Sequence, residues 1–157
     1  METGKIINQI SNRLRRRSRK VQESIGISGA QGNILDYILV ESAHRSIYQK
    51  EIEREFGLRP STATEALKLL EAKELICRIP EEKDGRYKRI VFTPKAMAVQ
   101  ENLRKEIRES EAILLRGITP KEQECFLKIT GKMLKNLDDS MEKDSEEEDR
   151  NHGKTGI

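Results

Sequence analysis

The chain has 157 residues, of which 35% are hydrophobic and 36% charged, and its net charge is +3. That length suits one domain, and so small an apolar fraction favours a core shared with a second chain. Its apolar runs fall short of the ~18 residues that cross a membrane, no apolar signal segment follows the basic N-terminus, and two cysteines do not make a disulfide framework. We therefore expect a soluble, cytoplasmic protein with no membrane partner.

Charge is unevenly distributed along the chain. Residues 1–30 hold seven basic and two acidic side chains, whereas residues 138–157 hold three basic and eight acidic ones. A basic body with an acidic tail indicates a nucleic-acid partner for the body only. The tail has no periodic apolar stripe, so we expect residues 138–157 to be disordered.

Residues 4–24 are predicted to form the first helix, because Ile7, Ile10, Leu14 and Val21 recur at heptad-like spacing. Its other faces are basic, with Arg13, Arg15, Arg16, Arg17, Arg19 and Lys20. These cations either form an arm that contacts phosphates or merely solvate the helix. We favour the second interpretation, because charge runs on helices usually serve only to solvate them.

A second helix is expected over residues 30–44, after Gly26, Ser28 and Gly29 interrupt the first. Its apolar stripe should pack beneath the element that follows. The stripe consists of Ile34, Leu35, Ile38 and Leu39.

The next stretch has the pattern of a helix-turn-helix. A short helix is predicted to end at Gly57, which can close a helix in the left-handed conformation, and Pro60 suits the first position of the next helix. In that second helix the expected buried stripe is Ala63, Ala66, Leu67 and Leu70. The residues that should face outward are Ser61, Glu65, Lys68 and Ala72. Thr62 and Thr64 should lie on the flanks. Small hydroxyls and a lysine at this place suit phosphates and base edges of DNA. An ordinary helical hairpin with a solvated face fits the stretch equally well.

Two strand-like segments after the helices favour the DNA-reading interpretation. Residues 76–80 and 87–93 are rich in β-branched and aromatic side chains, and the Asp84-Gly85 pair between them is a hairpin turn signal. Two helices followed by a basic hairpin have the order of a winged helix, in which the hairpin is the wing.

Two long helices are predicted in the C-terminal part. Thr93-Pro94 starts a helix that ends at Gly117, with Ala96, Val99, Leu103, Ile107 and Leu114 inside. Thr119 to Glu122 is a capping box, and the helix it starts carries the stripe Phe126, Ile129, Met133 and Leu137. Together with residues 4–24 this makes three long amphipathic helices. A winged helix does not need three such stripes, so we expect a two-fold homodimer.

Over residues 5 to 137 the sequence resembles the MarR family of bacterial transcription regulators. The resemblance rests on residues 49–56, 61–64 and 70–76, on Asp84-Gly85-Arg86 and on Phe92-Thr93. It implies an obligate homodimer whose recognition helices enter successive major grooves. It also implies that Asp84 orients Arg86 and that Arg86 enters the minor groove.

The sequence departs from the family pattern at three positions. Glu74 stands where the family usually has Gly after the recognition helix, so that turn should be strained or shaped differently. Glu65 places a negative charge on the reading face, and Ala96 stands where a Gly is common.

The predicted fold is mainly α with a small β-hairpin wing: a winged helix-turn-helix over residues 31–93 and helical dimerisation segments over residues 1–30 and 94–137. The candidate DNA-binding residues are Gln49, Arg59, Pro60, Ser61, Thr62, Thr64, Glu65, Lys68, Lys83, Asp84, Arg86 and Lys88.

Several other classes of function find no support in the sequence. It contains no Gly-rich phosphate loop, nucleophile elbow, paired-carboxylate site or metal-ligand cluster, so we predict no enzyme, no cofactor and no metal. No cysteine precedes Cys77, which excludes the N-terminal thiol switch of some similar regulators, and we expect Cys125 to be semi-buried and inert.

The leading hypothesis is a homodimeric, sequence-specific DNA-binding regulator, a repressor acting on a pseudo-palindromic operator. The resemblance adds relief by a small-molecule effector or stress signal. The alternative is a winged-helix protein-protein interaction module without a specific DNA target.

Overall fold

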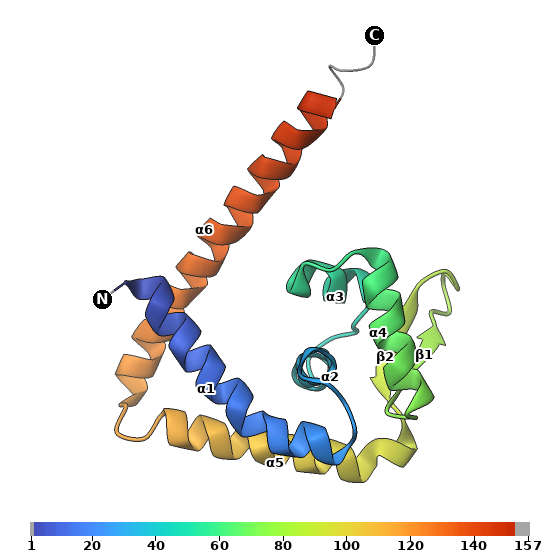
Figure 1. Ribbon diagram of the computed structural model, residues 1–157, viewed down its shortest axis with the longest axis horizontal. Coiled ribbons are helices and arrows are strands. Elements are labelled where there is room, and N and C mark those ends of the chain that lie inside the picture. Colours follow the sequence, from blue (N-terminus) through green and yellow to red (C-terminus); the bar gives the residue numbers. More distant parts are fainter. Residues whose placement is uncertain (1, 153–157) are drawn as a thin grey trace. The chain divides into compact units, whose positions relative to one another are not determined.

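The computed structural model describes residues 2–152 and divides into two compact units, the first ending at Ala112 and the second beginning at Ile113 (Figure 1). Residue 1 and residues 153–157 lie outside the described part. The elements in chain order are α1 (Thr3–Ser24), α2 (Gly29–Ser42), α3 (Gln49–Phe56), α4 (Pro60–Ala72), β1 (Ile76–Pro80), β2 (Lys88–Phe92), the 3-10 helix η1 (Pro94–Ala96), α5 (Met97–Leu114) and α6 (Pro120–His152).

The core of the first unit lies between α2, α3, α4 and the hairpin. The apolar stripes predicted for α2 and α4 are confirmed, since their large side chains are buried. Ile52 of α3, Ile76 of β1 and Ile90 of β2 complete the same cluster. Burying one such aliphatic side chain contributes roughly 1.5–3 kcal/mol, so this core fixes how the helix-turn-helix and the wing are held together.

The boundaries of α2 and α3 follow from their caps. Ser28 caps α2, because its hydroxyl accepts from the Gln31 amide at 3.3 Å while Gln31 Oε1 accepts from the Ser28 amide at 3.1 Å. Ser28 and Gly29 therefore begin α2, where the sequence suggested only a break after α1. Gly57 closes α3 with a φ of 60°, as predicted.

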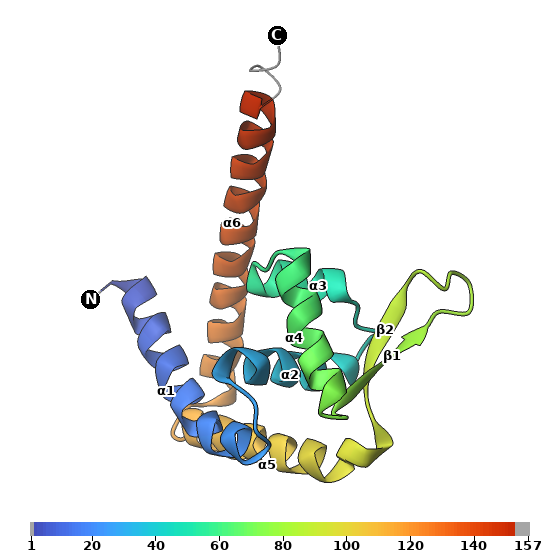
Figure 2. The same cartoon turned by 45° about the vertical axis from the view of Figure 1, so that its right-hand side comes forward.

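The hairpin is a two-stranded antiparallel sheet that extends beyond α3 and α4 (Figure 2). Its register runs from Ile76 opposite Phe92 to Pro80 opposite Lys88, which places the strands within a residue of their predicted limits. The Ile90 amide also donates to the Ile47 carbonyl at 2.7 Å. This bond ties the loop before α3 to the edge of β2.

The turn between α4 and β1 has the unusual shape expected of Glu74. Its φ is 57°, the one positive φ of a non-glycine among the described residues. The Leu75 amide donates to the Leu70 carbonyl at 3.1 Å, and Lys95 Nζ pairs with Glu74 Oε1 at 2.8 Å. The left-handed conformation costs a non-glycine residue about 1–2 kcal/mol, and the surrounding bonds hold it in place. Ala96, a second departure from the family pattern, is buried in η1.

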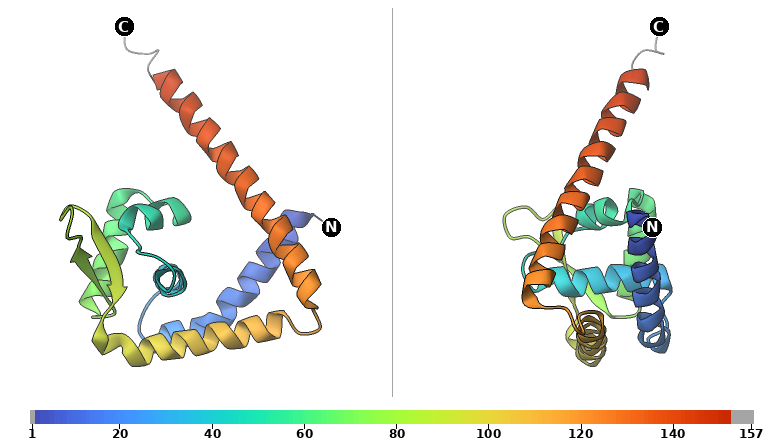
Figure 3. Two further views of the ribbon diagram at one scale, coloured as in Figure 1. Left: turned by 180° about the vertical axis from the view of Figure 1, so that it is seen from behind. Right: turned by 90° about the vertical axis from the view of Figure 1, so that its left-hand side faces the viewer.

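In the first unit, α1 crosses α5 at its C-terminal part and diverges from it toward the N-terminus, and polar groups connect these helices (Figure 3). Arg17 Nε donates to Ser110 Oγ at 3.1 Å. Gln22 is buried against Gly32, where an added Cβ would lie 2.1 Å from the Gln22 Cδ. Burial raises the pKa of Asp36 on α2 to about 6, the Glu106 charge adds to the rise, and the Gln22 amide opposes it. This polar seam was not anticipated from the apolar periodicity of the helices.

Helix α6 corrects one prediction. Residues 138–152 continue the helix and are not disordered, whereas the rest of the predicted tail lies outside the described residues. A helix already begun at the Thr119 capping box extends at little cost per residue, and the pairs Lys135–Asp139 and Glu146–Arg150 at i,i+4 support it.

Of three further predictions for the C-terminal part, the structure confirms one and contradicts two. The left-handed Gly117 follows α5 as predicted. Leu114, which was expected inside, is 39% exposed, because it lies at the very end of α5. Cys125 is exposed, where a semi-buried thiol was expected, since α6 has no neighbour covering that position within its own unit.

Candidate nucleic-acid interface

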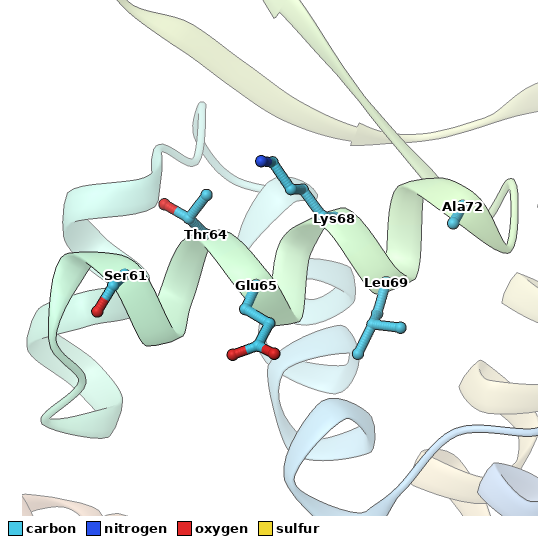
Figure 4. A pocket seen from close by; sticks show the side chains of 6 residues that line it. All are labelled: Ser61, Thr64, Glu65, Lys68, Leu69 and Ala72. Atoms are coloured by element: carbon cyan, nitrogen blue, oxygen red, sulfur yellow. The ribbon is translucent and has the colours of Figure 1, made fainter.

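The exposed face of α4 forms a shallow groove of about 610 Å³ (Figure 4). Thr64 and Lys68 lie along one edge of the helix, and Ser61, Glu65 and Leu69 along the other. Pro60 occupies the first helical position, as predicted, and Thr62, which was expected on a flank, is exposed. Leu69, which is 43% exposed, also lines this groove and was not among the predicted contact residues. Hydroxyls, a cation, a carboxylate and an apolar side chain together offer every kind of contact that a base edge can make.

The wing carries a preorganised arginine at its tip. Asp84 Oδ1 accepts from the Arg86 amide and from its Nε, both at 3.1 Å, and Asp84 Oδ2 accepts from Arg86 Nη2 at 2.8 Å. The Arg86 side chain is still 87% exposed. The bonds to Arg86 lower the pKa of Asp84, so this carboxylate remains ionised and the guanidinium keeps its direction. This is the Asp84–Arg86 contact that the resemblance implied.

A second groove, of about 630 Å³, lies between the start of α3 and the wing. Its walls include Gln49, Arg86 and Lys88, which were predicted from the sequence, and six residues which were not, among them the acidic Glu51 and Glu53. The other four are Tyr48, Lys50, Arg78 and Tyr87. Their basic and aromatic character was a visible signal, but only the fold brings α3 and the wing together.

Two of the predicted contact residues are bonded inside the protein. Gln49 Nε2 donates to Thr64 Oγ1 at 2.9 Å, and Gln49 Oε1 accepts from Arg78 Nη1 at 3.0 Å. Arg59 and Lys83 are exposed, the first just before α4 and the second in the wing loop. The structure therefore gathers the predicted residues on the α4 face, at the start of α3 and on the wing.

Over the described residues, no group of His, Cys, Asp and Glu side chains could hold a metal ion. In the same part of the chain, no helix combines the length and the apolar character required to span a membrane.

The helix-turn-helix and the basic hairpin pack on one core, and together they define a winged helix-turn-helix protein.

Comparison with known proteins shows which winged helix-turn-helix proteins this chain is similar to. The model of the MarR family matches residues 25–86. Over 92 residues the chain is 28% identical to YybA of Bacillus subtilis (strain 168), an uncharacterized HTH-type transcriptional regulator; the match covers 59% of this chain and 61% of that protein, so less than two-thirds of the relative's length. A MarR family transcriptional regulator from Silicibacter pomeroyi is 29% identical, with a TM-score of 0.68 over 84% of this chain and 87% of that one.

A third similar protein is a mutant form of S. aureus MepR bound to an oligodeoxyribonucleotide. It is 25% identical, with a TM-score of 0.54 over 87% of this chain and 99% of that one. The chain thus resembles the MarR family of winged helix-turn-helix transcription regulators, in sequence over residues 25–86 and in fold.

Proposed function

We propose that this protein is a sequence-specific DNA-binding repressor. The observation that carries the proposal is the pairing of two readers in one unit: the polar face of α4, and an exposed Arg86 held in direction by Asp84. Helix side chains suit base edges in a major groove, and an arginine suits the negative potential of a narrow minor groove. The DNA-bound MepR mutant supports the same interpretation.

The proposed assembly is a homodimer, with residues 1–30 and 94–137 as its dimerisation segments. Helix α6 exposes apolar side chains along much of its length, among them Phe126 at 55% and Leu134 at 63%, and α1 exposes Ile7 and Ile10. A second copy would cover such stripes, and a two-fold axis matches a pseudo-palindromic operator.

We further propose that a small anionic effector relieves the repression. A groove of about 420 Å³ lies where α1 meets the start of α2, with Arg15 and Arg19 in its wall. Buried Gln22 also lines it. Aromatic carboxylates should raise the melting temperature of the wild-type protein and not of Arg19→Ala. Equal shifts for both proteins would contradict this location.

Selection of bound sequences from random DNA, followed by affinity measurements across a salt series, tests the proposal. Each phosphate neutralised adds about 0.9 to the slope of log K against log salt, so DNA binding should weaken steeply as salt rises. A protein-protein interaction module is the second candidate, favoured by the exposed Leu69 on the α4 face. No enrichment of any sequence, together with a flat salt response, would support that module.

A further inference from the structure

Four side chains and one carbonyl connect strand β1 to the reading face of α4. Arg78 Nε donates to Glu71 Oε1 at 2.7 Å, and Arg78 Nη1 donates to Gln49 Oε1 at 3.0 Å. Gln49 Nε2 donates to Thr64 Oγ1 at 2.9 Å, and the Thr64 hydroxyl donates to the Pro60 carbonyl at 2.8 Å. We call this series the Arg78 relay.

The chemistry of its members gives the relay one direction. A guanidinium only donates hydrogen bonds, so the carbonyl oxygen of Gln49 must face Arg78 and its amino group must face Thr64. The Thr64 oxygen therefore accepts from Gln49, and its own hydrogen goes to the Pro60 carbonyl. Gln49 Nε2 also lies 3.3 Å from that carbonyl. Both ends of the Gln49 amide are thus engaged inside the protein, which leaves Gln49 poorly placed to read DNA itself.

One lone pair of the Thr64 oxygen remains unused, and it belongs to a residue of the reading face. Thr64 lines the α4 groove and lies on the same edge as Lys68 (Figure 4). Along this edge, then, a hydroxyl that can only accept is followed one turn later by an ammonium that can only donate.

Building on the proposed DNA binding, we propose that Thr64 accepts a hydrogen bond from an exocyclic amino group, adenine N6 or cytosine N4. Gln49 and Arg78 are positioning residues that hold the Thr64 hydroxyl in its accepting orientation. In the major groove guanine presents N7 and O6, and thymine presents O4; these are acceptors, so neither base can donate to Thr64. Discrimination at this one position follows from a bond network that begins at the Arg78–Glu71 ion pair between β1 and α4.

The first arm of the test compares sequence selection by the wild-type protein and by Thr64→Val. Valine keeps the shape and the apolar contact of threonine but has no hydroxyl. The position whose preference weakens in Thr64→Val is the position that Thr64 reads. Each base pair carries one amino group, on adenine or on cytosine, and reversing the pair moves that group to the other strand. We expect this reversal to cost the wild type about 3- to 10-fold, which is the contribution of one ordinary hydrogen bond.

The second arm removes the amino group from the DNA and leaves the protein intact. Purine replaces adenine, or 2-pyrimidinone replaces cytosine, at that position of the selected operator. Wild-type affinity should fall by about the same 3- to 10-fold, while Thr64→Val should not distinguish the two duplexes. Because this arm works with the wild type, it does not depend on the folding of a variant.

The third arm tests the positioning residues. Gln49→Leu and Arg78→Met keep the Thr64 hydroxyl, and each should reduce discrimination at this position at least 2-fold; Arg78→Lys, which keeps a donor-only group, should restore part of it. Lys88→Ala is the matched control, and it should weaken binding to all duplexes alike. A loss that is equal on all duplexes for Gln49→Leu and Arg78→Met would show that these residues only support the fold, and would overturn their role.

The outcomes separate this inference from the proposed function. A wild-type protein indifferent to loss of the amino group overturns the inference, and so does a Thr64→Val variant with unchanged selection. In each of these cases the protein still selects DNA, so the proposed function stands. If the wild type selects no sequence at all, the proposed function itself fails.

Discussion

The lobe from α2 to β2 and the helix α6 use their apolar side chains in opposite ways. In the lobe, Leu35, Ile38 and Leu67 are completely buried within the same unit. In α6, Phe126 and Leu134 are more than half exposed. The lobe therefore buries its apolar side chains within its own unit, whereas the apolar stripe of α6 is not covered by other residues of its unit. This difference supports the proposal that a second copy completes α6.

The largest effect should come from opening the closed core. Leu67→Ala leaves a cavity beneath α4 and should lower the free energy of unfolding by about 3 kcal/mol, whatever the protein concentration. Leu134→Ala is the matched change on α6, and it should act mainly by making the melting temperature more dependent on concentration. Urea and thermal unfolding at two concentrations measure both. A concentration-independent loss of the same size from Leu134→Ala would erase the contrast between the two regions.

The polar seam where α1 and α5 meet the lobe should respond to pH. The pKa of Asp36 is raised to about 6 in the fold, so the folded state binds this proton more tightly than the unfolded chain, whose carboxyl titrates near 4. Its contribution is greatest below pH 4 and is lost as the pH rises through 6. Asp36→Asn should therefore stabilise the protein by about 2 kcal/mol at pH 7.5 and hardly at all at pH 4.

Urea unfolding at both pH values checks this prediction, with the exposed Asp138→Asn as the control. The control should change stability equally little at each pH. If Asp36→Asn shifted stability by the same amount at pH 4 and pH 7.5, the carboxyl would not be the titrating group.

A smaller gain is expected where the lobe stores backbone strain. Glu74→Gly relieves a left-handed conformation, but it also loses the exposed pair with Lys95. The net effect should be a stabilisation of about 0.5–1 kcal/mol. Lys95→Ala measures the pair alone and should cost less than that. A destabilised Glu74→Gly protein would mean that the turn is not strained.

The smallest effect should follow truncation after Leu137. Residues 138–152 are helical, and residues 138–151 are exposed, so removal of the segment should reduce the helical circular dichroism signal without changing the melting temperature by more than about 2 °C. Operator affinity should stay nearly constant, and non-specific DNA binding should tighten slightly because acidic charge is lost. A large fall in melting temperature would show that this segment docks on the body.

Local signals in the sequence predicted much of the fold. Gly57, Pro60 and the Thr119 capping box fix helix ends through residues that are close in the sequence. Asp84 and Arg86 lie two residues apart, so their contact could also be anticipated. The Arg78–Gln49 bond joins residues 29 positions apart, and only the packing of β1 on α3 and α4 creates it.

Two other features escaped prediction for different physical reasons. The seam between Gln22 and Asp36 depends on the absence of a side chain at Gly32, which periodicity does not reveal. Residues 138–152 were expected to be disordered because acidic composition suggests solvation, yet ion pairs at i,i+4 and an established helix carry α6 through them.

The central claim is that the α4 face and the wing bind DNA together, and the most direct test measures operator and random-DNA affinity for Lys68→Ala and Arg86→Ala across a salt series. Lys68→Ala should cost on the order of 1–3 kcal/mol on the operator and much less on random DNA. Arg86→Ala should weaken both and reduce the salt slope by roughly one contact, with Asp84→Ala reproducing part of that loss. Equal and small effects of all three changes would contradict this claim.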